Sequence, residues 1–473
     1  MSVDVVLLIV GAVFVILLLS ECPVAFTLAA SGSLGVMLLR NAGVVGATLR
    51  DIPYSSTASY SLSIIPMYIL LGMFALNGRL AERIYLVASR SFGRLRGGLG
   101  VATVGACAGF AAVTGSSVAT AATIGRLSIS EMRLHGYPAP FAAGIVAAAG
   151  TLGVLIPPSV VLVFYGILAR ESIGQLLVAG IIPGVLSALL YIVYILTRGQ
   201  TLVAAEEARL ADVLAGEAAT ASDGETGGAP DANVDAGAAE ASNQVSPARE
   251  SRWTTLRAVG WIATIFAIII TGIYTGQFTV VESGAMGALV ALVMLITEVR
   301  RSGGARLWHA IRESLLDTAS ITSMAFAILV GASIFTIFLV MARVPMRFTE
   351  WVVGLQLPPI VVVIIILAAL IPLGMALETL SIIIITVPLI HPVVTGLGYD
   401  AVWFGILFVK MIEIGLVTPP VGMNAYVVSG ASGVPVEKTF RGVAPFVLID
   451  IVTVALLIAF PAITLWLPRL ADV

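Results

Sequence analysis

Two pairs of adjacent prolines stand inside long apolar stretches, one pair in each half of the chain. The surrounding segments, Gly153–Pro158 (GVLIPP) and Gly415–Pro420 (GLVTPP), share the pattern G-x-x-x-P-P. Proline has no backbone N–H and clashes with the preceding helical turn, so each pair should interrupt its helix. An interrupted helix presents free carbonyl oxygens, which are the ligands that hard cations prefer. The spacing therefore predicts a cation site at each interruption.

A short polar segment precedes each proline pair at the same distance. Ser116 in AAVTGSS lies 41 residues before Pro157, and Glu378 in LGMALET lies 41 residues before Pro419. Each segment is in the middle of a stretch of about 35 residues, which we interpret as a helical hairpin that enters the membrane and returns. The two hairpins are expected at about 98–133 and 357–393.

We expect the hairpin tips and the helix breaks to form two pseudo-symmetric sodium sites, with an anionic substrate between the tips. The candidate sodium-binding residues are Thr114, Gly115, Ser116, Ser117, Gly153, Pro157, Pro158, Ser159, Glu378, Thr379, Gly415, Val417, Thr418 and Pro419. The candidate substrate-binding residues are Ser116, Ser117, Glu378 and Asn424. The alternative interpretation is that proline and glycine only kink the helices while Ser and Thr cap the freed backbone. The matched arrangement in both halves favours the ion sites.

The composition places these segments in a membrane. Of 473 residues, 59% are hydrophobic and 11% are charged, whereas soluble domains carry roughly 25% charged residues. Many apolar runs approach the roughly 20 residues that cross a bilayer, which predicts an all-helical, multi-pass membrane protein. We read the first run as a span and not as a signal peptide, because it lacks a basic start and a cleavage site. Spans are expected near 3–20, 24–39, 61–77, 139–168, 172–197, 255–275, 280–298, 318–341, 401–430 and 443–467.

Further matches indicate that the two halves are a repeat. SGSLG, beginning at Ser31, matches SGAMG, beginning at Ser283, and a proline follows each proline pair at the same distance, Pro183 and Pro445. Five spans per half is an odd number, so the second half must enter the membrane in the opposite orientation and the repeat is expected to be inverted. Sixteen basic residues then lie on the side of the connecting segment and six on the other. The positive-inside rule places the connecting segment in the cytoplasm and both termini in the periplasm. The first hairpin is then expected to open to the cytoplasm and the second to the periplasm.

The connecting segment, residues 199–251, differs in composition from the rest. It has ten acidic residues, two arginines and no aromatic residue, so it cannot bury enough apolar surface to order itself. We expect a disordered acidic linker, starting as a short helix, between a first repeat (1–198) and a second (252–473). We also expect that its removal leaves transport intact.

Two stretches beside the spans are expected at the cytoplasmic surface. The stretch Arg79–Arg96 predicts an amphipathic helix lying along the membrane. Trp308 and His309 occupy the equivalent place in the second half.

Few ionisable residues fall inside the predicted spans, where they are costly and usually functional. Glu378 lies at a hairpin tip and is the best candidate for contacting an ion or for gating. Lys410 and Glu413 lie three residues apart on one helix face and could neutralise each other. We assign no role to Glu282 and Asp450, which we place near span ends facing water.

Other kinds of chemistry are not indicated. Cys22 and Cys107 have no ligand spacing and the three histidines are scattered, so neither a disulfide framework nor a transition-metal or haem site is expected. SGASG, beginning at Ser429, resembles an intramembrane protease motif but has no histidine on a nearby helix. GRLRGGLG, beginning at Gly93, lacks the ending of a nucleotide-binding loop, and we expect no nucleic-acid partner.

Several of these segments resemble one family, the large membrane subunit (DctM-like permease) of tripartite ATP-independent periplasmic (TRAP) transporters. The similar segments are AAVTGSSVATAATIG, AAAGTLGVLIPPSVVLVFYG, AGIIPG and EIGLVTPPVGMNAYVVSG. The resemblance implies an elevator-type carrier that uses Na⁺ and no organic cofactor. It also implies two partners, a small four-helix membrane subunit and a periplasmic binding protein that delivers an organic acid. By position, the family's sodium-binding regions correspond to Thr114–Ser117 with Gly153–Ser159, and to Ala376–Thr379 with Gly415–Pro420.

Three features depart from the family pattern. Glu378 stands where an aspartate is expected, and Lys410 lies in a region that usually has no lysine. The acidic linker is longer than usual, yet far too short to contain four spans. The small subunit should therefore be a separate chain.

The sequence thus predicts a large permease subunit in the bacterial inner membrane that imports a small organic anion, such as a carboxylate, with sodium. No bond is made or broken, so it is not expected to be an enzyme. The alternative is a stand-alone or proton-coupled carrier of the same architecture. An intramembrane hydrolase would need a Ser–His or paired-Asp arrangement that the spans do not offer, and a channel would not need two opposed hairpins.

Overall fold

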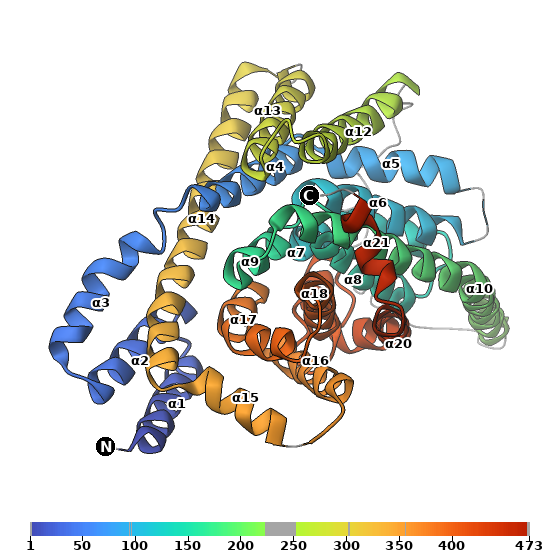
Figure 1. The fold of residues 1–473 in the computed structure, drawn as a ribbon. Helices are drawn as coiled ribbons and strands as arrows, with labels where there is room; N and C mark the ends of the chain where they lie inside the picture. Colours follow the sequence, from blue (N-terminus) through green and yellow to red (C-terminus); the bar gives the residue numbers. More distant parts are fainter. Residues whose placement is uncertain are drawn as a thin grey trace.

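The chain folds into helices throughout the part that the computed structural model describes, which comprises residues 2–93, 95, 97–222, 252–300, 303–354 and 356–470 (Figure 1). The predicted all-helical class is confirmed. The elements of the first half are α1 (Val3–Leu19), α2 (Val24–Leu39), α3 (Ala42–Ser55), the 3-10 turn η1 (Tyr60–Ser63), α4 (Ile64–Asn77), α5 (Leu80–Phe92), α6 (Gly98–Thr114), α7 (Ser117–Leu134), α8 (Ala139–Leu155), α9 (Val160–Ala169) and α10 (Ile173–Ser222). Those of the second half are α12 (Arg252–Tyr274), α13 (Val280–Val299), α14 (Gly304–Met341), α15 (Val344–Gly354), α16 (Pro359–Ala376), α17 (Thr379–Gly396), α18 (Ala401–Val417), α19 (Met423–Ser432), α20 (Val436–Ala459) and α21 (Ala462–Leu470).

Six helices in the described ranges are long and apolar enough to cross a membrane, fewer than the ten spans that the sequence predicts. Five of them lie at predicted spans, namely Tyr60–Asn77, Ile173–Ala205, Val280–Val299, Gly304–Met341 and Val436–Ala459. The sixth, Thr379–Gly396, is the second arm of the hairpin predicted at 357–393. The pair α8 and α9, bent by 43°, makes a seventh if it is counted as one span. The difference arises because α1, α2 and the apolar part of α12 have at most 17 residues, somewhat short of the roughly 20 that span a bilayer. The predicted span at 401–430 is divided into α18 and α19.

The outer helices pair across the two halves of the chain. Helix α2 packs along α14, and its counterpart α13 packs along α4. A Cβ on Gly32 of α2 would lie 2.7 Å from the Cα of Phe335, and a Cβ on Gly284 of α13 would lie 2.7 Å from the Tyr68 ring. Small residues at helix contacts allow such close packing in membranes. The two small-residue motifs, SGSLG and SGAMG, therefore make equivalent contacts.

The inner helices surround α8 and α18 (Figure 1). Helix α8 packs against α6, α7 and α20, and α18 packs against α16, α20 and α10. The contact of α8 with α20 is especially close, because a Cβ on Gly144 would lie 2.2 Å from the backbone carbon of Gly442. Across the halves, α7 packs on α19 and α17 packs on α9. The second arm of each predicted hairpin thus contacts the end part of the broken helix from the other half.

The surface segments differ in part from the sequence prediction. Residues 42–55, which lie between two predicted spans, form helix α3. The helix expected within 79–96 is α5, but Trp308 and His309 are not its counterpart, because they lie on the 38-residue helix α14. Residues 305–330 contain no glycine or proline, so α14 continues without a break. By order along the chain, the counterpart of α5 is α15, since each directly precedes a predicted hairpin.

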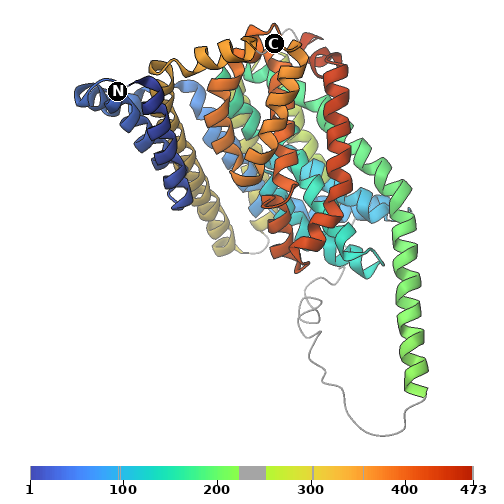
Figure 2. The same cartoon turned by 90° about the horizontal axis from the view of Figure 1, so that it is seen from below.

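Helix α10 extends away from the helical body on one side (Figure 2). Figure 2 shows the start of α1 and the end of α21 on the opposite side of that body. Residues 199–222, the start of the predicted linker, continue α10 without interruption, so this part is one helix with the preceding span. Residues 223–251 of the predicted disordered linker lie outside the described residues.

Candidate functional site

The tip between α6 and α7 rests on the break between α8 and α9. Gly115 closes α6 with a φ of 60°, a left-handed conformation that glycine adopts without strain. A Cβ on Gly115 would lie 2.6 Å from the Pro158 carbonyl oxygen, and a Cβ on Gly153 would lie 3.1 Å from the Ser116 carbonyl oxygen. The backbones of four predicted sodium-binding residues, Gly115, Ser116, Gly153 and Pro158, are therefore in close contact. Any side chain at Gly115 or Gly153 would push them apart.

Hydroxyl groups around this contact bond to the adjoining helix ends. Ser116 caps α7 by accepting from the Ala119 N–H at 3.3 Å. Ser159 is fully buried; it accepts from the Leu162 N–H at 3.1 Å and donates to the Val154 carbonyl. Thr114 Oγ1 donates to a carbonyl of its own helix. Each hydroxyl oxygen has two lone pairs. The hydroxyl groups at the tip and at the break can therefore still accept a further hydrogen bond or contact a cation.

The ends of four helices in the first half set the electrostatics of this contact. Helices α6 and α8 end here, and their last carbonyl oxygens lack intrahelical partners. Helix C-termini carry partial negative charge and favour cations, whereas the N-termini of α7 and α9, which also lie here, favour anions. The electrostatics of this contact therefore favour a cation beside the helix C-termini and an anion beside the N-termini.

The second half has the same construction with different close contacts. Helix α16 meets α18 backbone to backbone, because a Cβ on Gly415 would lie 2.6 Å from the Cα of Gly374. Thr418 caps the end of α18, and its Oγ1 donates to the Ile414 carbonyl at 2.5 Å. Glu378 caps the start of α17 and accepts from the backbone N–H groups of the second and third helical residues at 3.1 and 3.3 Å. The charge of Glu378 thus lies at a helix N-terminus, where it is favourable.

The other predicted residues occupy the ends of the same elements. Ser117 and Thr379 are the first residues of α7 and α17, and both are buried. Val417 is the last residue of α18. The proline pairs Pro157–Pro158 and Pro419–Pro420 lie in the breaks, each joined by a cis peptide bond.

Asn424 is a fully buried amide whose two polar atoms have no hydrogen-bond partner among the described residues. It lies on α19, directly after the second break, and α19 packs against α7. Leaving a buried polar group unpaired costs about 1–3 kcal/mol, so an unpaired amide at this place is suited to a ligand. Within the described part, no hydrogen bond or ion pair joins Asn424 or Glu378 to Ser116 or Ser117.

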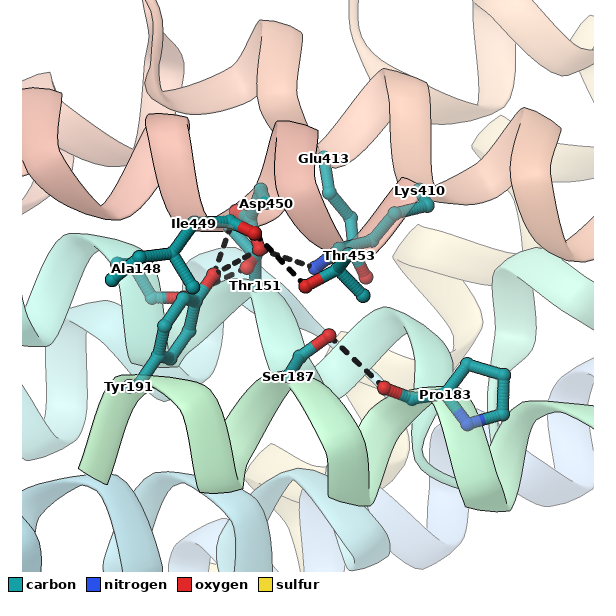
Figure 3. Close-up of polar contacts among 10 residues, drawn as sticks. All are labelled: Ala148, Thr151, Pro183, Ser187, Tyr191, Lys410, Glu413, Ile449, Asp450 and Thr453. Atoms are coloured by element: carbon teal, nitrogen blue, oxygen red, sulfur yellow. Dashed lines mark hydrogen bonds and ion pairs between the residues drawn. The ribbon is translucent and has the colours of Figure 1, made fainter. Parts of the chain in front are cut away.

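A buried cluster of charges connects α18, the first part of the second broken helix, with α10 and α20 (Figure 3). Lys410 Nζ lies 3.0 Å from Glu413 and 2.8 Å from Asp450, and all three side chains are fully buried. The Tyr191 hydroxyl, from α10, donates to Asp450 at 2.6 Å. The predicted pairing of Lys410 with Glu413 is confirmed, whereas the expectation that Asp450 faces water is wrong. The signal was present, because an acidic residue inside an apolar span needs a partner.

Glu282 lies at the surface, as its sequence position suggested. It is exposed and forms a capping box with Thr279 at the start of α13. Capping the helix accounts for its carboxylate.

The family model of the tripartite ATP-independent periplasmic transporter, DctM component, matches residues 10–463. This chain belongs to that family. The C4-dicarboxylate TRAP transporter large permease protein DctM of Pseudomonas aeruginosa is 33% identical over 445 residues, which cover 94% of each chain.

Other relatives differ in their substrates and in their length. The sialic acid TRAP transporter large permease protein SiaM of Vibrio cholerae is 28% identical and covers 98% of each chain. The isethionate TRAP transporter permease protein DctMQ of Oleidesulfovibrio alaskensis is 31% identical, but the match covers 89% of this chain and only 59% of that longer protein. Among solved structures, the YdaH transporter of Alcanivorax borkumensis matches with a TM-score of 0.61 at 15% identity over 89% of each chain, which shows a shared fold.

Membership of the DctM family confirms several predictions. The chain is a large permease subunit of a TRAP transporter, a multi-pass protein of the inner membrane and not an enzyme. The family description names it as one component of a tripartite system. The coupling ion, the substrate and the transport mechanism go beyond what family membership establishes.

Proposed function

We propose that this TRAP permease imports a small organic anion, such as a carboxylate, together with sodium ions bound at the two helix breaks. The observation that carries this proposal is the backbone contact of each hairpin with the broken helix of its own half, through Gly115 and Pro158 in one and Gly374 and Gly415 in the other. These contacts put helix C-termini and hydroxyl groups together where the sequence pattern indicates a cation site. Asn424 supports an anion site beside the second break, because it is buried and has no hydrogen-bond partner among the described residues.

The movement that carries the substrate across the membrane would be of the elevator type, and the inverted repeat would be its structural basis. The cross-packing supports the repeat, because α2 with α14 corresponds to α13 with α4, and α7 with α19 corresponds to α17 with α9. The outer helices would be the scaffold, and the hairpins with the broken helices would be the moving part. Both termini would be periplasmic and the linker cytoplasmic, in agreement with the opposite placement of the chain ends and the end of α10 in Figure 2.

The chain would act with two partners, a small four-helix membrane subunit and a periplasmic substrate-binding protein. The tripartite family description and the longer fused relatives support this assembly. The small subunit would be a separate chain, because the linker is too short to contain four spans.

Uptake into proteoliposomes tests the proposal. The permease, its small subunit and its binding protein are reconstituted together, and uptake of radiolabelled carboxylic acids is measured with an inward gradient of sodium or of potassium. We expect uptake that requires the sodium gradient and the binding protein. Uptake that a proton gradient drives equally well without sodium would favour the proton-coupled alternative, in which Glu378 would be the first residue to replace.

A further inference from the structure

A positively charged cavity lies outside the proposed transport site, where several outer helices end. Its volume is about 350 Å³, and its lining includes Arg79, Arg83, Arg306 and Glu298. A second, more open hollow beside it is lined by Arg257 and Arg300, among others. We call these five arginines and Glu298 the arginine pocket. They come from the start of α5, from α12, from the end of α13 and from the start of α14.

Glu298 is the buried centre of the arginine pocket. Its side chain is 3% exposed and forms ion pairs with both Arg83 and Arg257. The ion pair with Arg257 joins the two hollows, with the Nη2–Oε2 distance at 2.5 Å. These contacts fix two of the guanidinium groups against the protein, so they are pre-arranged and do not have to be ordered by a ligand.

The arginine pocket carries more positive charge than its glutamate and the neighbouring helix C-termini neutralise. Five arginines against one glutamate leave four positive charges. The C-termini of α4 and α13 add about half a negative charge each, which still leaves a clear excess. Arg79 reaches only the exposed Glu82, at 3.9 Å. Arg300 and Arg306 are exposed and form no ion pair with any residue in the described ranges.

One buried donor of the arginine pocket has neither a hydrogen-bond acceptor nor an ion-pair partner among the described residues. Arg257 Nε is buried and donates no hydrogen bond to any described residue. A guanidinium with an unused donor and a fixed orientation binds phosphate oxygens well, because it can donate two parallel hydrogen bonds. The chemistry of the pocket therefore matches a phosphate group with net negative charge.

The position of the arginine pocket indicates where such a phosphate would come from. The ends of the helices that form it meet at these two hollows, and Figure 1 shows α12 and α13 beside α4 and α5. Apolar membrane helices end at the level of the lipid headgroups, where basic pockets between helices bind anionic lipids. We propose that the arginine pocket binds the phosphate of an anionic phospholipid headgroup and so anchors α4, α5, α12 and α13 to the membrane surface. This role is independent of the coupling ion.

Lipid-dependent stability of the purified chain tests the proposal. Thermal unfolding is measured in an uncharged detergent while phosphatidylglycerol is added, and in parallel with phosphatidylcholine at equal mole fraction or with inorganic phosphate. A ligand that binds the folded state raises the melting temperature in a saturable way. The test variant is R79Q/R306Q, which removes two exposed lining arginines and leaves the buried ion pairs of Glu298 in place. The matched control is R126Q/R133Q, which removes two exposed arginines of α7 that line neither hollow.

We expect a saturable rise with phosphatidylglycerol and none with phosphatidylcholine, whose phosphate charge is cancelled by its choline. Half-saturation should require at least tenfold more phosphatidylglycerol in R79Q/R306Q, and it should be unchanged in R126Q/R133Q. An equal rise with millimolar inorganic phosphate would support the phosphate site but assign it to free phosphate. A lipid response that is absent, or the same in R79Q/R306Q as in the unaltered chain, would overturn the proposal.

Discussion

At the scale of single residues, the buried polar groups of this permease fall into two kinds. Lys410, Glu413, Asp450 and Tyr191 contact one another and bring three helices together. Asn424 is equally buried but has no hydrogen-bond partner among the described residues. The first group is suited to holding the inner helices together, and Asn424 is suited to binding something that is transported.

Substitution of Lys410 tests the first role. Lys410→Met would leave Glu413 and Asp450 as buried carboxylates without a cation, and removing one partner of a buried pair costs about 3–5 kcal/mol. The free energy of unfolding, measured by denaturant titration in detergent, should fall by that amount. In K410M/E413Q the uncompensated charge of Glu413 is also removed, so the double variant should recover much of the free energy of unfolding that Lys410→Met loses. Losses that simply add in the double variant would show that the two side chains do not interact.

Substitution of Asn424 separates a binding role from a structural one. Asn424→Leu replaces an unpaired amide with an apolar group of similar size, which should leave the melting temperature unchanged or raise it. Substrate uptake should nevertheless fall at least tenfold, because the amide would no longer contact its ligand. Full uptake in this variant would remove Asn424 from the substrate site.

The sequence revealed the pair Lys410–Glu413 because the two residues are neighbours on one helix turn. It did not reveal that Asp450 and Tyr191 complete the cluster, since these residues lie on other helices and α10 belongs to the other half of the chain. Likewise, the sequence placed Glu378 at a hairpin tip but gave no indication that its carboxylate caps α17.

At the scale of elements, the contact of a hairpin tip with a helix break depends on glycine. Gly115 has a left-handed conformation, and a Cβ there would lie 2.6 Å from the carbonyl oxygen of Pro158. Gly105 lies on the same helix, and a Cβ there would meet no atom within 4 Å. The two glycines therefore form a matched pair for substitution.

Gly115→Ala should destabilise the protein and separate the tip from the break. The left-handed conformation alone costs about 1–2 kcal/mol for alanine, and the contact with Pro158 adds to this. Gly105→Ala should be neutral or stabilising by up to about 1 kcal/mol. Unfolding free energies in detergent check both values. Equal behaviour of the two variants would contradict the close contact between tip and break.

Breaks in the helices were easier to predict than their continuation. Each proline pair marked a real interruption, since α8 ends at Leu155 and α18 ends at Val417. The continuation of α14 from Gly304 to Met341 was not predicted, because its polar first part and its apolar second part look like separate segments, and the absence of glycine and proline from residues 305–330 permits a continuous helix without requiring one. Packing along α2 and α4 joins them.

At the scale of the whole molecule, the two halves are packed into each other and are not separate units. Helix α2 pairs with α14 and α4 with α13, so neither half keeps its outer layer alone. The sequence repeats predicted the correspondence of the halves. They did not predict which helix would contact which, because that is decided by surfaces brought together only in the folded chain.

The acidic segment that joins the halves should be dispensable for transport. Residues 223–245 contain no aromatic residue and many acidic ones, so they have little capacity to pack against the helices. Deleting them should leave sodium-dependent uptake within twofold of the full chain. The measurement is uptake normalised to the amount of permease in the membrane, and loss of uptake at normal abundance would show that the segment has a role in transport.

The central claim, sodium bound at the helix breaks, is tested most directly by thermal unfolding of the purified protein across a sodium titration, with potassium and choline at matched ionic strength. Binding to the folded state alone stabilises it by RT ln(1 + [L]/Kd). Ser116→Ala and Thr418→Ala are compared with Ser128→Ala, which removes a buried hydroxyl elsewhere on α7. The quantity compared between variants is the rise in melting temperature that sodium causes, because losing the Ser116 cap lowers stability by about 1 kcal/mol by itself. We predict a saturable rise specific to sodium that weakens in the first two variants and persists in Ser128→Ala. A melting temperature that responds equally to sodium, potassium and choline would contradict the account.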